Sequence, residues 1–353
     1  MSLIWQKVYP VIVAILFFEL IILVHEGGHC IAAKLMKIKV NEFSVGMGPK
    51  LFGFKKGDTQ YTFRLLPIGG YCSMEGEDEK SNDENSFENK SVLQRIFVVI
   101  AGALMNLVMG LVIIGIMVST QNLIGIPVVA DFDENAVSCE ALMKNDRIKA
   151  IDGMRVYTAT DVFTGLSRSR DENVEFTVLR DGEEMNIDVP FDMTQENGTR
   201  FISLDFYMYG NQKTVGGVVK EIFAQFVSFC RIVFLSVADL IGGRFGVSDL
   251  SGPVGTVSAV SSAVKSNLSG VLRITALLSV NIGLFNLFPF PALDGWKLFA
   301  LIFEGIFKKR LPQKIEWAIN TAGLVFLLGL MCVVTFLSLI HISEPTRLLS
   351  ISY

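Results

Sequence analysis

Four long apolar blocks limit what this chain can fold into. They run from Val8 to Met36, from Val92 to Val118, from Ile274 to Phe290 and from Ala318 to Ile340. A helix needs about 20 residues to cross a hydrocarbon core about 30 Å thick. Hydrophobic residues make up 51% of the chain and the mean hydropathy is +0.47, which is too apolar for an ordinary soluble domain. We therefore predict a multi-pass α-helical membrane protein with four transmembrane helices.

The distribution of basic residues predicts the orientation of these helices. Six lysines lie between residues 34 and 56, at and after the end of the first block, whereas Lys7 alone precedes it. Five more basic residues separate the third and fourth blocks. Short loops rich in lysine and arginine face the cytoplasm, so both termini are expected outside. The first block lacks a basic start and a small-residue cleavage site, and is expected to remain as an anchor.

Charge and cysteine content exclude two other classes. The formal net charge is −4 and no basic stripe is present, so nucleic acid is not an expected partner. The five cysteines are scattered and never form a Cys-x-x-Cys pair. Neither a disulfide framework nor a thiolate zinc site is therefore predicted.

Patterns between the apolar blocks predict further parts. Alternating apolar and polar residues with glycines indicate a β-hairpin or small sheet, an acidic run indicates a linker, and Asp-Gly turns between short strands indicate a soluble α+β module. The expected organisation is a first transmembrane helix at residues 1–37, a membrane-associated β region and linker at 38–90, a second transmembrane helix at 91–118, the module at 121–193, amphipathic interfacial helices at 194–270, a third transmembrane segment at 271–295, a cytoplasmic loop at 296–316, and a fourth transmembrane helix at 317–340. Residues 341–353 turn polar without a periodic pattern and are expected to be a non-native or disordered tail.

The first apolar block contains a metal-binding pattern. Residues 25–29 read His-Glu-Gly-Gly-His and fit His-Glu-x-x-His. In a helix, residues i and i+4 share a face, so His25 and His29 can bind one zinc ion while Glu26 stands beside them as a general base. A chance match is the alternative. It is disfavoured because polar and ionisable residues inside a membrane span are costly and are retained mainly for function.

A zinc site needs a third protein ligand. The only other histidine, His341, lies in the polar tail on the opposite face of the membrane, so we expect a carboxylate. Asp294 is the candidate because it ends the third block on the cytoplasmic side; its alternative role is that of a solvated residue at a helix end. Pro289 and Pro291 argue for the ligand, since two prolines interrupt a helix and free carbonyls that membrane proteins tolerate beside a polar cavity.

Taken together, these residues give the chain a resemblance to a known family. Over nearly all of residues 8–340 it resembles the site-2 protease family, and within it the bacterial members that carry a PDZ module. The matching residues are His25, Glu26, Gly28, His29, Gly102, Asn106, Asn286, Pro289, Pro291, Asp294 and Gly295. Gly27 stands where a bulky apolar residue is usual, and Trp296 stands where a second glycine is common.

The resemblance implies roles for individual residues. It implies that His25, His29 and Asp294 hold zinc and that Asn286 assists binding of the substrate backbone or of the transition state. It also implies a β-hairpin that dips into the membrane and pairs with an unwound substrate segment, as in strand addition. The residues expected to contact substrate are Gly46, Gly48, Arg64, Leu65, Leu66 and Asn106.

Two features leave alternatives open. The module at 121–193 resembles a PDZ domain, which would bind a peptide terminus in its groove, but it would also serve as a spacer that limits access. Ala141 and Asn145 replace family glycines there. Glu19 lies seven residues before Glu26 on nearly the same helix face, which permits a substrate or proton-path role; a buried carboxyl bonded to a neighbouring helix is the simpler interpretation.

We therefore expect a zinc metalloendopeptidase in a bacterial cell membrane, with its module extracytoplasmic and its zinc site toward the cytoplasmic side. Its partners would be single-pass membrane proteins already trimmed by another protease, such as anti-sigma factors, or signal-peptide remnants. The alternative from another class is a catalytically inactive scaffold that gathers partners through its PDZ module. A transporter is disfavoured because the sequence shows no internal repeat.

Overall fold

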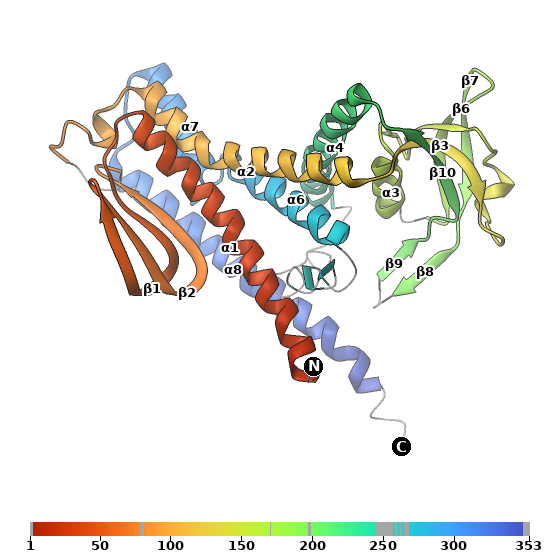
Figure 1. Cartoon of the computed structure of the whole chain (residues 1–353), viewed down its shortest axis with the longest axis horizontal. Helices are drawn as coiled ribbons and strands as arrows, with labels where there is room; N and C mark the ends of the chain where they lie inside the picture. The colour runs from red at the N-terminus through yellow and green to blue at the C-terminus, as the bar shows by residue number, and fades with distance from the viewer. Residues whose placement is uncertain are drawn as a thin grey trace. The chain divides into compact units, whose positions relative to one another are not determined.

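The computed structural model describes residues 3–77, 81–169, 171–196, 199–243, 257, 260–261, 263–264 and 268–348. The chain divides into two compact units, of which the first joins Met1–Ile113 with Leu235–Tyr353 and the second is Ile114–Phe234. The first unit contains α1 (Leu3–Leu35), β1 (Val40–Lys56), β2 (Thr59–Met74), the short 3-10 helix η1 (Phe87–Asn89), most of α2 (Val92–Thr120), α6 (Leu268–Phe285), α7 (Asp294–Phe307) and α8 (Gln313–Leu348) (Figure 1).

Five described helices have the length and apolar composition needed to cross a membrane. Their apolar stretches are Val11–Leu35, Val92–Thr120, Val215–Ile241, Leu268–Phe285 and Lys314–Phe336. Four of them overlap the blocks found in the sequence. The fifth is α4 (Val215–Ile241), which the sequence predicted to lie along the membrane interface. The predicted count of four is therefore not confirmed, because α4 buries its polar residues Gln225, Ser228 and Asp239 and is apolar over much of its exposed surface.

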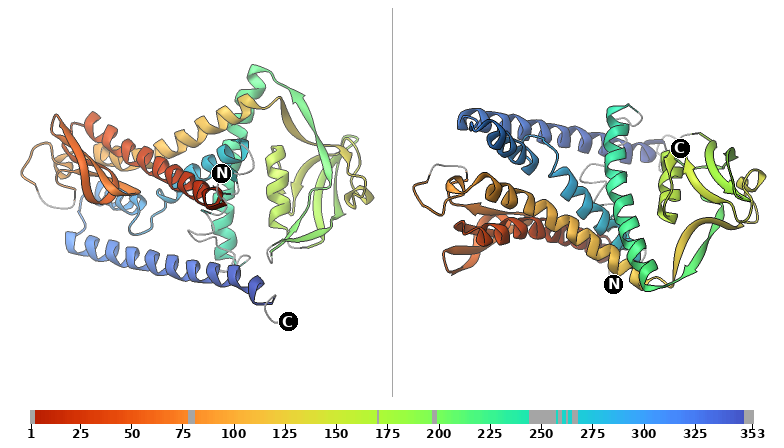
Figure 2. Two further views of the ribbon diagram at one scale, coloured as in Figure 1. Left: turned by 60° about the horizontal axis from the view of Figure 1, so that its bottom comes forward. Right: turned by 90° about the horizontal axis from the view of Figure 1, so that it is seen from above.

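Small residues let the helices of the first unit pack closely. A Cβ on Gly28 of α1 would stand 2.5 Å from the carbonyl oxygen of Ala101 on α2. A Cβ on Gly283 of α6 would stand 3.0 Å from the carbonyl oxygen of Ala103, also on α2. Close backbone packing of this kind holds helices together where lipid removes the hydrophobic driving force. Helix α2 therefore contacts both α1 and α6, and the three run side by side in the right-hand view of Figure 2.

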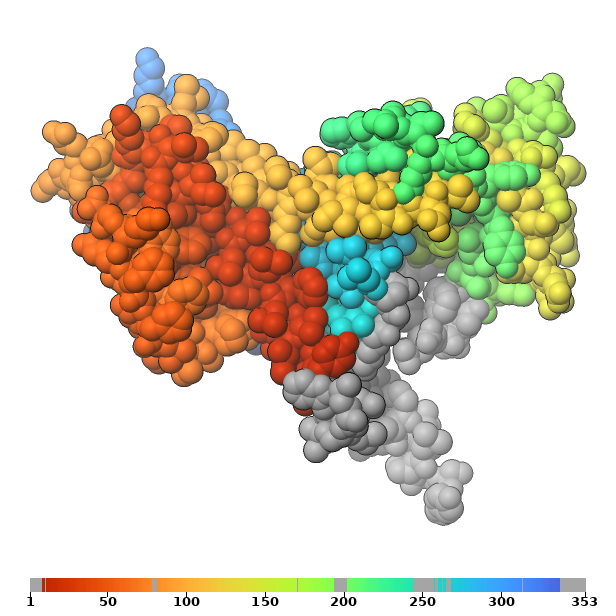
Figure 3. Space-filling view, in the orientation of Figure 1, coloured from red at the N-terminus to blue at the C-terminus, as the bar shows by residue number. Residues whose placement is uncertain are grey.

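Strands β1 and β2 form one sheet that folds back on itself: its two outer pairings are antiparallel, whereas residues 42–45 run parallel to residues 60–63. Phe43 in the first part of β1 pairs with Cys72 on one side and with Tyr61 on the other, and Tyr61 also pairs with Phe54. The last part of β2, residues 70–74, is therefore an edge of the sheet. The hairpin contacts α1, and its side chains lie directly against that helix in Figure 3. The prediction of a β region after the first helix is confirmed in these strands.

The second unit is built on one sheet. It contains β3 (Leu123–Phe132), the 3-10 helix η2 (Ser138–Glu140), β4 (Arg147–Ile151), β5 (Met154–Arg155), α3 (Ala159–Arg168), β6 (Asn173–Arg180), β7 (Glu183–Pro190), β8 (Met193–Glu196), β9 (Thr199–Ile202), β10 (Phe206–Gln212) and most of α4. The strand order is β10-β3-β4-β6-β7, with β5 paired to β4, while β8 pairs with β9. The predicted Asp-Gly turns at 152–153 and 181–182 have positive φ at both residues, as two-residue hairpins require.

The module is longer than the sequence predicted. Strand β10 pairs with β3, with Gln212 opposite Leu123, so the sheet begins and ends with neighbouring strands. Residues 193–212 thus contain strands where interfacial helices were expected, and α4 starts only at Val215. Short strands with little helical periodicity were hard to recognise beside the long apolar helix that follows. Much of the rest of the expected 194–270 region lies outside the described residues.

Two further boundaries differ from the prediction. The third predicted helix stops at Phe285, and Asp294 is the first residue of a separate helix, α7, which continues to Phe307 in what was expected to be the cytoplasmic loop at 296–316. Pro289 and Pro291 explain the interruption, since neither can donate a backbone hydrogen bond to a continuing helix. At the other end, α8 continues to Leu348, so residues 341–348 of the expected non-native or disordered tail are helical, and its remaining residues lie outside the described ones.

A buried ion pair fixes α7 against α2. Arg95 on α2 donates to both carboxylate oxygens of Glu304 on α7, at 3.0 and 2.6 Å, and the two side chains are 6% and 15% exposed. Glu304 also accepts from Arg310, whose side chain is 53% exposed. Burial by itself would raise the pKa of the Glu304 carboxyl, but its bonds to the two arginines lower it below the ordinary value. The pair therefore stabilises the fold at neutral pH and loses its effect as the pH falls through that lowered pKa.

Replacing Glu304 with alanine should destabilise the protein by about 3 kcal/mol, because it leaves the Arg95 guanidinium buried without a counter-charge. Replacing Arg310 with alanine removes an exposed partner of the same carboxylate, together with its bond to the Glu88 carbonyl, and should cost about 1 kcal/mol or less. Reversible unfolding in detergent micelles, followed by circular dichroism, measures both changes. Equal losses in the two variants would show that the buried pair does not hold α7.

Candidate active site

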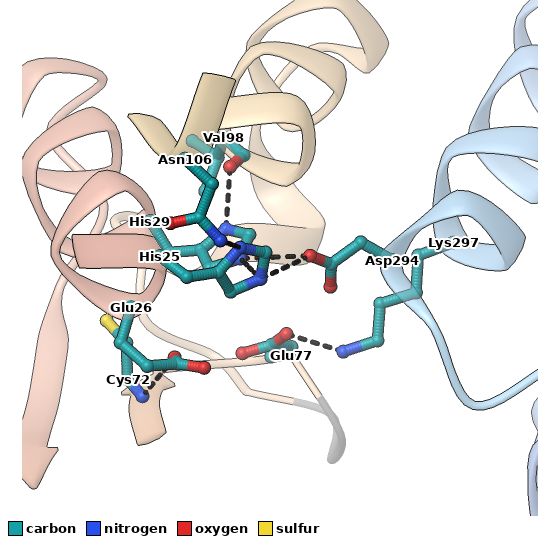
Figure 4. Close-up of polar contacts among 9 residues, drawn as sticks. All are labelled: His25, Glu26, His29, Cys72, Glu77, Val98, Asn106, Asp294 and Lys297. Atoms are coloured by element: carbon teal, nitrogen blue, oxygen red, sulfur yellow. Dashed lines mark hydrogen bonds and ion pairs between the residues drawn. The ribbon is translucent and has the colours of Figure 1, made fainter. Parts of the chain in front are cut away.

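Three side chains from two distant parts of the chain meet at one point. His25 and His29 lie one helical turn apart on α1, and Asp294 is the first residue of α7. The Asp294 Oδ2 atom is 3.0 Å from His25 Nε2 and 3.1 Å from His29 Nε2, and the two Nε2 atoms are 3.3 Å apart. Figure 4 shows the three side chains converging between the helices. The structure thus brings together the three residues that the sequence predicted as zinc ligands.

The three donor atoms fit a zinc ion. Tetrahedral zinc with ligand distances of about 2.1 Å places its ligand atoms roughly 3.4 Å apart. The observed separations of 3.0–3.3 Å are close to that value. Two imidazole nitrogens and one carboxylate oxygen also make up a donor set typical of catalytic zinc, which keeps a fourth position for water or substrate.

Helix α2 orients both histidines. The Nδ1 atom of His29 lies 2.9 Å from the carbonyl oxygen of Val98, so Nδ1 carries the proton and Nε2 is left with its lone pair. The amide of Asn106 lies 3.4 Å from Nδ1 of His25, and its Oδ1 atom has no other partner among the described residues. Because amide oxygen and nitrogen are interchangeable in shape, turning this amide lets Oδ1 accept from His25 Nδ1. Outer contacts of this kind fix metal-binding histidines in one tautomer.

The turn between α6 and α7 places Asp294. The backbone of this turn passes so close to the start of α7 that a Cβ on Gly295 would stand 1.9 Å from the carbonyl oxygen of Phe288. Only glycine fits there, which accounts for the Asp-Gly pair. Ala292 has a positive φ and donates its N–H to the Asn320 side chain on α8. A carboxylate at the first position of a helix is further stabilised by the helix dipole.

Glu26 is held beside the ligands without being one of them. Its Oε2 atom accepts the backbone N–H of Cys72, on the edge of the hairpin, at 3.0 Å. The metal-binding group comprises His25, His29 and Asp294 and does not include Glu26. This arrangement fixes one carboxylate oxygen and leaves the other available for a water molecule. The hairpin thereby contributes directly to the position of the expected general base.

Besides the Arg95–Glu304 pair, an ion pair between Lys297 and Glu77 lies next to the site. The sequence did not predict it. Lys297, one turn after Asp294 on α7, donates to Glu77 at 2.7 Å. Glu77 follows β2 in the acidic segment that the sequence marked only as a linker, and Figure 4 shows the pair beside the ligands. The Cys72 N–H, the Val98 carbonyl and the Arg95–Glu304 pair were missed as well. Backbone groups carry no residue signature, and no short spacing links Glu77 to Lys297.

The residues predicted to touch substrate have different surroundings. Arg64 bonds to Ser44, Gly48, Glu42 and Tyr71 within the hairpin, so its guanidinium is engaged in holding the sheet. Leu65 and Leu66 are exposed, and Gly46 and Gly48 have positive φ. Asn106 contacts His25, as described above.

Asn286 follows the last turn of α6, where its N–H bonds to Ile282, and it is not among the three ligands. Its catalytic role and the substrate contacts of the hairpin residues and of Asn106 remain predictions. The structure places Asn106 where it can orient a ligand.

A His-Glu-x-x-His helix of membrane-crossing length, completed by a carboxylate from another helix, defines the site of a membrane metalloprotease. Comparison with known proteins gives the particular family. The pattern of peptidase family M50 matches residues 13–330. The chain belongs to this family, the site-2 proteases, and its metal is zinc.

Similar proteins are named consistently. A relative from Clostridium perfringens is 35% identical over 340 residues, covering 94% of this chain and 98% of its own length. Another from Clostridium acetobutylicum is 31% identical, with coverage of 94% and 98%, and one from Fusobacterium nucleatum is 30% identical, with coverage of 90% and 94%. Each bears the name "Putative zinc metalloprotease".

Replacing Gly102 with alanine should displace a zinc ligand, because the added Cβ would stand 2.3 Å from Nε2 of His29. The ring has to turn away, so we expect zinc affinity to fall at least about tenfold, as losses of supporting contacts do. Alanine at Gly115, on the same helix, meets its nearest atom at 3.8 Å and should leave zinc binding unchanged. Titration with a competing chelator measures both. Full zinc affinity in the Gly102 variant would contradict this ligand geometry.

Proposed function

We propose that this protein hydrolyses peptide bonds within the transmembrane segments of other proteins. The observation that carries the proposal is the place of the catalytic pattern. His25, Glu26 and His29 lie within Val11–Leu35, a stretch long and apolar enough to cross a membrane, and Asp294 joins them there. A site at that position meets substrate inside the bilayer and not in water.

The residues around the ligands suit hydrolysis. Zinc held by His25, His29 and Asp294 supplies Lewis-acid activation of water and of a peptide carbonyl. Glu26, with one oxygen bound to the Cys72 N–H, takes a proton from the attacking water through its other oxygen and returns it to the leaving amine. Val98 and Asn106 hold the two imidazoles in place throughout.

The edge of the hairpin supports binding of an unwound substrate. A transmembrane helix hides its amides in its own hydrogen bonds, so a protease that cuts it must supply other partners. In an antiparallel ladder, alternate residues direct their N–H and C=O groups away from the paired strand. Cys72 directs its N–H away from the paired strand and toward Glu26. This implies that Gly70, two residues before it, also directs its N–H and C=O groups away from the paired strand. An extended substrate segment can add here as a strand, next to the catalytic base.

Apolar side chains on the hairpin support its contact with lipid. Leu51, Phe52, Phe54, Leu65, Leu66 and Ile68 are each more than half exposed. An isolated exposed apolar residue needs no explanation, but a group of them marks an interaction surface. We assign this surface to the bilayer, because the same hairpin contacts α1, the helix that carries the zinc ligands.

The substrates we propose are single-pass membrane proteins that another protease has already trimmed, for example anti-sigma factors, or signal-peptide remnants. Lysine-rich loops after α1 favour a zinc site toward the cytoplasmic side and an extracytoplasmic module, in a bacterial cell membrane. The relatives named above all come from bacteria. The chain would then act in regulated intramembrane proteolysis.

Replacing Glu26 with glutamine tests the proposal most directly. Cleavage of a model transmembrane peptide by the purified protein should fall by about 10²–10⁴-fold, because the general base is lost, whereas zinc content should remain near one per chain. Replacing Asp294 with alanine should instead lower both cleavage and zinc affinity, since two histidines alone hold the ion poorly.

The combination separates the roles of the two carboxylates. A Glu26→Gln variant without zinc would make Glu26 a ligand. A wild-type protein that binds zinc and cleaves no membrane peptide would favour the alternative of an inactive scaffold.

For the second unit, we propose a role in selecting substrates before chemistry. This unit combines a sheet with helix α3, which is the α+β composition expected of a PDZ-like domain. The groove of such a domain binds a peptide terminus by strand addition. Asn145, which replaces a family glycine, has φ of +76°, a conformation that asparagine tolerates better than most residues, so the turn keeps its shape. A folded domain of this size would also exclude substrates that carry large outer domains.

Removing the module should relax selection and preserve chemistry. Because Leu123 and Gln212 are paired neighbours, a short glycine-serine turn can replace residues 124–211 without separating the ends of α2 and α4. The shortened protein should cut a trimmed membrane peptide at the wild-type rate and should also cut its untrimmed counterpart, which the full chain rejects. Paired cleavage assays in membrane vesicles measure both rates. A folded, zinc-loaded variant that cuts neither substrate would show that the module organises the active site.

A further inference from the structure

Glu19 is a carboxylate within the first membrane-length helix that the zinc chemistry does not use. It is 6% exposed. Its Oε1 atom accepts the backbone N–H of Gly46 at 3.1 Å, and the backbone N–H of Gly69 also faces the carboxylate. We infer that Glu19 is a positioning residue, which sets the register of the hairpin edge against α1 and so determines which substrate bond reaches Glu26. This inference rests on the function proposed above.

The hairpin edge contacts one face of α1 at successive positions along the helix. Glu19 and Glu26 are seven residues apart and therefore lie on nearly the same side of the helix. Ile22 and Glu26 are the side chains of α1 nearest to a Cβ placed on Gly70, at 3.9 and 3.8 Å. Glu26 then accepts from Cys72. The hairpin is thus held by Glu19 at Gly46, which lies beside Gly69, and by Glu26 at Cys72, three residues further along the edge, with apolar packing between these two points.

Glu19 binds the hairpin at the point where its own ladder is irregular. Val45 pairs with Gly70, but Met47 pairs with Leu66, so the register shifts between these two pairs. Gly46 and Gly69 flank the shift with φ of +80° and +88°, which side-chain-bearing residues rarely adopt. A backbone N–H at such a bulge has no partner on the opposite strand. The Glu19 carboxylate supplies that partner, and so fixes the bulge at one position.

Fixing the bulge has a consequence for cleavage. A strand whose register is weakly specified slips, and a slip of two residues keeps the same side chains facing the same way. If the bulge moved, the outward backbone groups near Gly70 and Cys72 would shift along α1 relative to Glu26. A substrate strand paired to this edge would shift with them. One buried hydrogen bond that involves no zinc ligand therefore controls the choice of scissile bond.

A single acceptor oxygen is sufficient for this role. The Oε2 atom of Glu19 has no hydrogen-bond partner among the described residues. Glutamine at this position retains an acceptor oxygen of the same reach, whereas leucine of similar size lacks one. The two substitutions therefore separate the hydrogen bond from simple packing. Alanine at Leu20, an exposed neighbour on the same helix, serves as the control for changes that do not touch the hairpin.

The experiment compares full-length wild type, Glu19→Gln, Glu19→Leu and Leu20→Ala on one transmembrane peptide, with the cut ends identified by mass spectrometry. We expect the glutamine and control variants to cut the wild-type bond. The leucine variant should bind zinc normally, spread its cuts over neighbouring bonds and lose at least about tenfold in kcat/KM. Cleavage at the single wild-type bond with the wild-type rate would overturn the inference. So would an equal, uniform loss in the glutamine and leucine variants.

Hydrogen exchange of the hairpin provides a test that does not need activity. Amides in residues 42–74 should exchange faster in Glu19→Leu than in wild type or Glu19→Gln, because the bulge is released. Unchanged exchange in Glu19→Leu would overturn the inference, whether or not the wild type is active. An inactive wild type would count against the proposed function alone. If the leucine variant does not fold, Glu19→Ser keeps a polar group that is too short to reach Gly46 and takes its place in both measurements.

Discussion

The rest of this structure depends on the cost of placing polar groups inside an apolar helix. Helix α1 carries two histidines and two carboxylates within a stretch that otherwise suits lipid, and such groups are tolerated only when they are paired or bound to a metal. Each of them has a partner from outside α1. The histidines meet Asp294, Val98 and Asn106, while the carboxylates meet backbone amides of the hairpin. The arrangement of α2, α7 and the hairpin around α1 follows from satisfying these groups.

Glycines make that arrangement sterically possible. The imidazole of His29 occupies the space that a side chain on Gly102 would fill, and the backbone of Phe288 occupies the space beside Gly295. The backbone of Ala101 on α2 likewise occupies the space beside Gly28, so α1 and α2 can pack closely. A Cβ on Gly27, its neighbour, would meet no other part of the described chain within 4 Å, so Gly27 performs no such role. The unusual second glycine of the zinc-binding pattern therefore leaves the ligand geometry unaffected.

The sequence predicted the parts of the site whose spacing reflects a regular structure. His25, Glu26 and His29 follow the helical repeat, and Asp294 follows a proline-rich interruption at the end of an apolar block, so all four could be assigned without a structure. What the sequence missed lacks a local pattern. The backbone donors and acceptors that orient these residues have no residue identity, and the pairs of Arg95 with Glu304 and of Glu77 with Lys297 connect positions about two hundred residues apart. Predicted boundaries were wrong where a strong pattern lay beside a weak one. The long apolar pattern of α4, for example, made the short strands before it hard to recognise.

The pairing of Leu123 with Gln212 has a consequence for how this chain changes over evolutionary time. A domain whose two connections leave side by side is a closed insertion, and residues added to or lost from its interior do not alter the distance between the helices that flank it. The loops between β3 and β10 are therefore free to lengthen, shorten or be exchanged, whereas the helices that hold the zinc ligands are constrained by contacts in which a single methyl group does not fit. Divergence among related proteases should concentrate in the insertion and spare the helices that hold the zinc ligands.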